Sequence, residues 1–155
     1  MNFRRDSYVV KADGARIAAL ISIRVRLLRL TDPPQSALMV LILSADAIAA
    51  ALLGALIETL GYPVRFARPP ETADETIRRV RPSVCLLDCE DPENCSDAFL
   101  GHAAMRGISV VVFGKREALE HLRALALADD IDMLIVPPDT VTVDDALRRA
   151  MKKAG

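Results

Sequence analysis

The residues SVCLLDCEDP, numbered 83–92, set the frame for interpreting this chain. Four apolar residues follow Pro82 and Ser83, and the run ends abruptly at Asp88, before an acidic turn that contains Pro92. A short apolar run between such breaks is typical of a strand buried in a parallel sheet. Such a strand presents its first polar residue at the carboxyl edge of the sheet, where α/β proteins place their sites. Asp88 is therefore the first candidate functional residue.

The chain around this stretch alternates between apolar runs and helical segments. The predicted strands are 37–43, 62–67, 84–87, 108–113 and 131–136. The predicted helices are 48–60, 72–80, 96–105, 115–127 and 143–153. Pro63 favours an outer position for the second strand, and Thr142 or Asp144 is the expected cap of the last helix. Five strands alternating with five helices predict a doubly wound parallel sheet with helices on both faces.

Composition and charge exclude several classes of protein. The net charge is −1, which gives no overall attraction to nucleic acid or membrane, and aromatic residues at 4% are too few for a base-stacking surface. Three cysteines without a secretory signal favour a reducing cytoplasm over a disulfide framework. No apolar stretch reaches the roughly 18 residues of a membrane span without a charge. Neither a dinucleotide-binding glycine motif nor a P-loop is present.

Residues 1–36 differ from the rest of the chain and are expected to form a basic N-terminal extension to a domain at 37–155. They carry seven Lys and Arg against three Asp, net +4, whereas the remainder carries thirteen against eighteen acidic residues, net −5. The alternation of apolar and polar residues at 21–27 favours a strand. The Ala-rich segment at 15–20 favours a helix instead. A basic amphipathic helix that contacts a membrane or a partner is one form of this alternative. Translated sequence upstream of a start near Met39 is a further alternative.

From residue 37 to about 153, the chain resembles the receiver domain of response regulators, the CheY-like phosphoacceptor of two-component phosphorelay signalling. LGYPV at residues 60–64 and RPSVCLLDCEDP at 81–92 resemble the second and third strands of that family, with no gap in spacing from Ser44 to Pro92. ISVVVFGK at 108–115 and IDMLIVPP at 131–138 resemble its last two strands. The resemblance implies a flavodoxin-like sheet of order 2-1-3-4-5, with the site at the carboxyl ends of the strands.

The resemblance also assigns roles to individual positions. Asp88 takes the phosphoacceptor position, and Pro92 agrees with the family proline that follows it. The acidic pair that holds a divalent metal maps to Ser44 and Ala45, neither of which is a carboxylate, so only the next residue, Asp46, is acidic. The backbone carbonyl that completes the metal site maps to Glu90. Asp46 and Asp88 are therefore expected to bind Mg²⁺ weakly, if at all, and no cofactor is expected to be required.

Two further family positions have changed. The Thr or Ser that bonds the phosphoryl group maps to Gly114, and the lysine that pairs with it maps to Val136, although Lys115 lies one residue past Gly114. Losing the hydroxyl and the lysine removes both charge stabilisation and the family's readout. The sequence thus predicts a degenerate receiver, a pseudo-receiver, around a vestigial pocket.

Other interpretations of single residues stay open. Asp46 also fits the N-cap of the following helix, and Asp88 could simply cap the loop after its strand. Cys85, Cys89 and Cys95 lack zinc-ligand spacing, so they are expected to be structural.

The expected function is a non-enzymatic signalling domain in the cytoplasm that acts by phosphorylation-independent protein–protein contact. Its expected partner is a histidine kinase, or an output or adaptor protein, on a face at about residues 115–151, and a homodimer is also considered. One alternative is a working phosphoacceptor that receives a phosphoryl group on Asp88 from a histidine kinase. Another is a flavodoxin-like domain that binds a small molecule in a deep apolar pocket at the strand ends, with Asp88 turned away.

Overall fold

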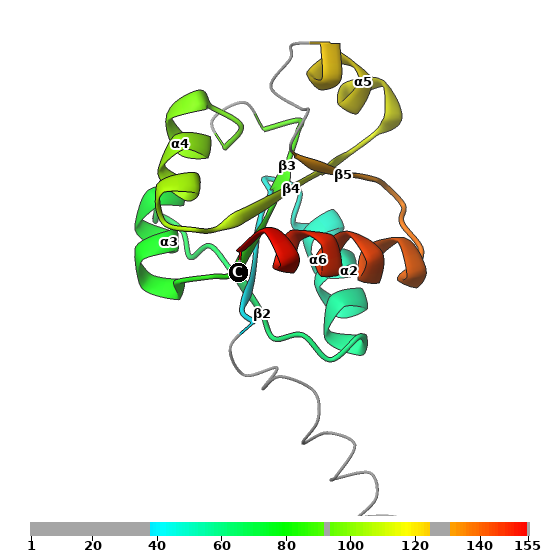
Figure 1. Ribbon diagram of the computed structural model, residues 1–155, viewed down its shortest axis with the longest axis horizontal. Helices are drawn as coiled ribbons and strands as arrows, with labels where there is room; N and C mark the ends of the chain where they lie inside the picture. The colour runs from blue at the N-terminus through cyan, green and yellow to red at the C-terminus, as the bar shows by residue number, and fades with distance from the viewer. Residues whose placement is uncertain (1–37, 92–93, 125–130, 155) are drawn as a thin grey trace, which may run out of the picture. The chain divides into compact units, whose positions relative to one another are not determined.

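The computed structural model describes residues 38–91, 94–124 and 131–154, which build a parallel sheet between two layers of helices (Figure 1). The sheet has five parallel strands in the order β2-β1-β3-β4-β5, which confirms the predicted flavodoxin-like topology. The strands are β1 (Val40–Leu43), β2 (Val64–Phe66), β3 (Val84–Asp88), β4 (Ser109–Gly114) and β5 (Asp132–Ile135). The helices are α2 (Ala47–Thr59), α3 (Ala73–Val80), α4 (Asp97–Met105), α5 (Arg116–Ala124) and α6 (Thr140–Ala154).

The apolar runs of the central strands are buried because both faces of the sheet are covered. All five residues of β3 are buried, as the opening stretch predicts. Alternate side chains enter different cores. Val40 and Ile42 pack with α2 and α6, whereas Leu41 and Leu43 pack with α3, α4 and α5. The order of the strands brings β1, β3 and β4 together at the centre, and their carboxyl ends meet at one edge.

Capping and turn residues in the sequence predict most element boundaries correctly, but the predicted start of the last helix is wrong. The second strand is a short edge strand, as Pro63 predicts, and Thr72 caps α3 with a capping box completed by Glu75. Helix α6, however, begins at Thr140, three residues before the predicted start. The carboxylate of Asp139 accepts a hydrogen bond from the Thr142 N–H at 2.7 Å, so the predicted caps Thr142 and Asp144 are wrong.

Several predictions concern residues outside the part of the chain that the structure describes. They are the nature of the extension at 1–36, the position of Pro92, and residues 125–127, which are the predicted end of the helix before the fifth strand. Within the described ranges, no helix combines the length and the apolar character that crossing a membrane requires.

Candidate functional site

The register between β1 and β3 brings two of the predicted site residues together. Leu43 lies opposite Leu87, so Ser44 and Asp88, the residues that follow, meet at the carboxyl edge. The hydroxyl of Ser44 donates a hydrogen bond to Oδ2 of Asp88 at 2.5 Å. A neutral donor thus occupies the place where the receiver resemblance would put a metal-binding carboxylate.

Asp88 is buried, with 7% of its surface exposed, and both of its carboxylate oxygens accept hydrogen bonds. Oδ1 accepts from the backbone N–H of Glu90 at 3.0 Å, and Oδ2 accepts from Ser44. The carbonyl of Asp88 accepts from the Asp91 N–H at 3.1 Å and from the Cys95 thiol at 3.4 Å. Asp88 therefore organises the turn after β3, and local donors stabilise its negative charge.

Asp46 lies near this pair in the chain, but its carboxylate serves helix α2. Its Oδ1 accepts from the backbone N–H groups of Ile48 at 2.9 Å and Ala49 at 3.0 Å. This is the N-cap role that the sequence also offered. Ser44 connects the two aspartates, because its Oγ accepts from the Asp46 N–H at 3.0 Å while its hydroxyl hydrogen goes to Asp88.

These residues do not fit the acidic site that a receiver uses for Mg²⁺. One carboxylate caps a helix, the other already accepts hydrogen bonds from two donors, and Ala45 between Ser44 and Asp46 offers no oxygen on its side chain. Among the described residues, no group of three or more His, Cys, Asp or Glu side chains is arranged to hold a metal ion. Weak Mg²⁺ binding by Asp46 and Asp88 stays a prediction, and no step below depends on it.

Gly114, at the end of β4, has its side-chain position filled by sulfur. A Cβ added to Gly114 would overlap the Sγ of Cys89. Cys89 is fixed there because its N–H donates to the carbonyl of Phe113 at 2.9 Å. The space that the resemblance assigns to a Thr or Ser hydroxyl thus holds a thiol from the neighbouring strand end. The sequence carried no signal for this replacement, since it depends on a contact between two strands.

The thiols at this edge are poor nucleophiles. Burial, reinforced by the charges of Asp88 and Glu90, raises the pKa of the Cys89 thiol. Burial, together with the neighbouring Cys89 and Asp88, raises the pKa of Cys95 to about 11. Burial also raises the pKa of Cys85, which is fully enclosed. Since the thiolate is the reactive form, these neutral thiols suit the structural role predicted for them.

Lys115 and Val136 do not supply a cation to Asp88. The ammonium of Lys115 pairs with the carboxylate of Glu90 at 3.3 Å, and both side chains are largely exposed. Val136 is neutral, and its N–H donates to the carbonyl of Gly114 at 3.0 Å, which extends the pairing of β5 with β4. The structure therefore gathers the predicted pocket residues at one edge, but a cationic partner for Asp88 is missing from the described residues of that edge.

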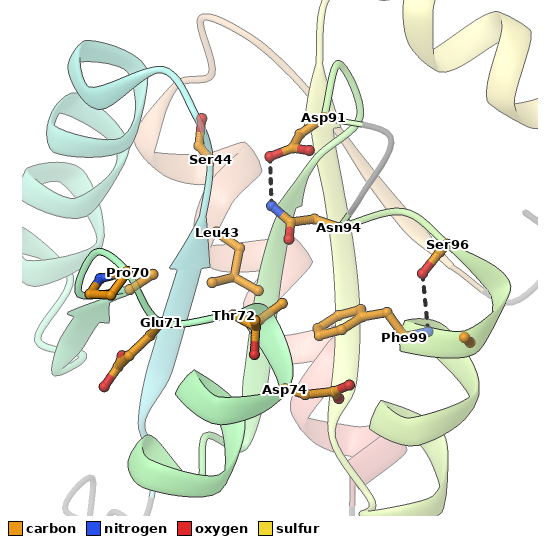
Figure 2. A pocket seen from close by; sticks show the side chains of 13 residues that line it. Leu43, Ser44, Pro70, Glu71, Thr72, Asp74, Asp91, Asn94, Ser96 and Phe99 are labelled. Carbon is orange, nitrogen blue, oxygen red and sulfur yellow. Dashed lines mark hydrogen bonds between the residues drawn. The ribbon is translucent and has the colours of Figure 1, made fainter.

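A cavity of about 480 Å³ opens beside this edge, between the starts of α3 and α4 (Figure 2). Its polar lining includes the carboxylates of Glu71, Asp74 and Asp91, and Asn94 donates to Asp91 at 2.7 Å. Leu43 and Phe99 form its apolar part. Asp88 is not among the lining residues, as the small-molecule alternative expects. Three carboxylates make this cavity unlike the deep apolar pocket that this alternative predicts, whereas a second cavity at the ends of β1 and β2 has a mostly apolar lining that also lacks Asp88.

Comparison with known proteins supports the fold. Neither a protein-family model nor a curated protein sequence matches this chain. Solved structures do match. An uncharacterised protein from Neptuniibacter caesariensis superposes with a TM-score of 0.63 at 19% identity, over 76% of this chain and 89% of that one. A response regulator receiver domain protein from Clostridium thermocellum gives 0.57 at 16% identity, over 75% and 95%. NtrX from Brucella abortus gives 0.61 at 17% identity, over 76% of this chain and 27% of that one. At these identities the likeness establishes that the chain has the fold of receiver domains.

Proposed function

We propose that this chain is a receiver-like domain of two-component signalling that acts by protein–protein contact, without phosphorylation of Asp88. The observation that carries the proposal is the hydrogen bond from Ser44 to Asp88. It puts a neutral hydroxyl where a working receiver needs carboxylates for a divalent metal. The acceptor position is kept, while the group beside it stabilises the aspartate as it stands.

Phosphoryl transfer to a carboxylate places several negative charges close together, so it depends on cations and hydrogen-bond donors around the transferred group. The edge around Asp88 supplies few of them. Gly114 has no hydroxyl and its side-chain space is taken by Cys89. Val136 is neutral, and the nearest lysine along the chain, Lys115, pairs with Glu90. These contacts support a domain that holds one state permanently.

The surface for a partner, on this proposal, is formed by α5, β5 and α6, the part of the chain at about residues 115–151. Two large apolar side chains are exposed there, Ile135 at 42% and Val141 at 70%. Exposed apolar residues among charged ones are typical of contact surfaces. A histidine kinase, or an output or adaptor protein in the cytoplasm, is the proposed partner, and the domain itself catalyses no reaction.

The test is phosphorylation of the full chain by a small phosphodonor. The protein is incubated with acetyl phosphate and Mg²⁺, and its intact mass is measured beside that of the variant Asp88→Asn. We expect neither mass to change. A stoichiometric gain of one phosphoryl group in the wild type that is absent from Asp88→Asn would overturn the proposal and favour the working phosphoacceptor.

A matched variant shows whether a lack of phosphorylation is due to an inactive site or to acetyl phosphate being an unsuitable phosphodonor. Ser44→Asp together with Ala45→Asp restores the acidic pair without touching the buried core, since Ser44 is half-buried and Ala45 is exposed. If the lost carboxylates are what silences the site, this variant should gain Mg²⁺ affinity, measured by calorimetry, and some phosphorylation at Asp88.

A further inference from the structure

The outward side of α2 is apolar, which is unusual for a helix on the surface of a domain. Ile48, Ala51, Leu52 and Ala55, called the α2 face below, are all exposed and follow the i, i+3, i+4, i+7 pattern of one helix side. Ile48 is 74% exposed and Leu52 is 69% exposed. The inward side carries Leu53 and Ile57, so α2 is apolar on both sides. A helix of this composition is normally covered all round.

An apolar cavity adjoins the α2 face. Its volume is about 520 Å³, and its lining includes Ala47 and Ala51 of α2 with Phe66, Ala67 and Pro69 of the second strand and the loop after it. Small alanine side chains leave this hollow open beside the projecting Ile48 and Leu52. Projecting apolar side chains and an apolar cavity thus lie side by side on one surface. Exposed apolar patches of this kind mark interaction sites.

Charges of opposite sign lie at the two ends of the α2 face. Glu58 is exposed in the last turn of α2, and Arg68 is exposed between Ala67 and Pro69 near the first turn. Among the described residues, neither Glu58 nor Arg68 has an ion-pair partner. Glu58 follows Ala51 by two helical turns, so it lies on the flank of the helix that borders the cavity.

This distribution matches itself after a two-fold rotation. When two α2 helices pack face to face and antiparallel, the rotation keeps the flank of each helix and reverses its ends. Glu58 of one copy then faces Arg68 of the other, twice in the complex. A parallel two-fold arrangement exchanges the flanks, so Glu58 of one copy would not meet Arg68 of the other. Isologous interfaces require this kind of self-complementarity.

We infer that the α2 face binds a second copy of this chain, as an antiparallel two-fold dimer. Ile48 and Leu52 of the two copies pack against each other beside the apolar cavities, and the two Glu58–Arg68 pairs set the direction of packing. The inference is independent of Asp88 and of the α5, β5 and α6 surface, so the dimer leaves that surface available to a different protein.

The first test is sedimentation equilibrium of the full chain and of Leu52→Asp. The wild type is expected to dimerise, and Leu52→Asp to raise the dissociation constant at least about thirty-fold, as expected for the loss of a central apolar contact. Met105→Asp is the matched control, because the Met105 side chain is 79% exposed on α4. It should leave the dimer unchanged. Ile48→Lys repeats the test at a second position should Leu52→Asp fold poorly by circular dichroism.

A charge exchange tests the direction of packing. Glu58→Arg and Arg68→Glu are each expected to weaken the dimer several-fold, because each puts like charges opposite one another, and the double variant should restore it. A monomeric wild type would overturn the inference and leave the α2 face to another occupant. It would also be overturned by Leu52→Asp and Met105→Asp having equal effects, or by a double variant that binds no more tightly than either single one.

Discussion

Helices α2 and α3 pack on opposite faces of β1, and they are stabilised in different ways. Helix α2 has thirteen residues, with no acidic residue in its first turn and no basic residue in its last, and it buries Ala50, Leu53, Gly54 and Ile57. Helix α3 has eight residues, buries only Thr76 and Ile77, and has acidic residues in its first turn and basic residues in its last. Apolar burial stabilises α2, whereas caps and ion pairs contribute much of the stability of α3.

The contrast shows which surfaces of the molecule are complete in the monomer. On α3, polar side chains satisfy one another, as in the pair of Arg79 with Glu71 at 2.6 Å and the capping box of Thr72 with Glu75. On α2, the apolar character continues to the outward side, where Ile48 and Leu52 are exposed. The polar side chains on a helix surface can pair with one another within the monomer, whereas an exposed apolar patch marks an interaction site. The difference can be tested by substitutions on each helix.

The largest effect is expected from the inward side of α2. Ile57 is fully buried, so Ile57→Ala leaves a cavity and should lower the free energy of unfolding by about 2–5 kcal/mol. Ile48→Ala on the outward side of the same helix should change it by less than about 0.5 kcal/mol. Urea unfolding of both variants at low protein concentration measures the difference. Equal losses would mean that the outward side is already packed in the monomer.

A smaller effect is expected from the two helix caps. Thr72→Ala and Asp46→Ala each remove a side chain that accepts from the first turn, and each should lower stability by about 1 kcal/mol. Hydrogen exchange should separate them. The amides of α3 should lose protection in Thr72→Ala because that helix buries few side chains, whereas α2 should stay protected in Asp46→Ala. Similar loss in both helices would mean that α2 and α3 depend equally on their caps.

The sequence predicted what local patterns encode. The sequence of a buried parallel strand is an unbroken apolar run, so β1, β3 and β4 could be predicted from composition and spacing alone. Pro63 marked the edge strand, and Asp46 was recognised as a candidate N-cap. The strand order came from the resemblance to receiver domains. Asp139 was missed as the start of α6 because Thr142 and Asp144 carry equally good capping side chains nearby in the sequence.

Contacts between distant segments could not be predicted in the same way. The bond from Ser44 to Asp88 depends on the register of two strands, and the sulfur of Cys89 fills the space at Gly114 only after β3 and β4 pair. The outward side of α2 also could not be predicted, because the sequence pattern of a helix that is apolar all round does not show which side faces the core. In α3, by contrast, the single buried aliphatic residue, Ile77, stands out among charged neighbours.

The smallest expected effect concerns the ion pair between Glu71, which precedes α3, and Arg79 in the last turn of that helix. The hydrogen bond from Arg79 lowers the pKa of Glu71 to about 2, and the Arg68 N–H and the Thr76 hydroxyl also donate to this carboxylate. A lowered pKa stabilises the fold above the ordinary value of 4.5, and this stabilisation is lost as the pH falls toward 2. Glu71→Gln should therefore be less stable than the wild type at pH 7, with the difference shrinking between about pH 4.5 and 2.

Urea unfolding at a series of pH values measures this difference. Added salt should reduce it at pH 7, because the pair lies at the surface and is screened. Glu58→Gln on α2 is the matched control, because Glu58 is exposed and has no ion-pair partner within the described part of the chain. Its stability should follow the wild type at every pH when the protein is dilute enough to be monomeric. A difference for Glu71→Gln that stays constant down to pH 2 would show that the charge of Glu71 contributes nothing. Helix α3 would then depend on burial and capping alone, and its contrast with α2 would be one of degree.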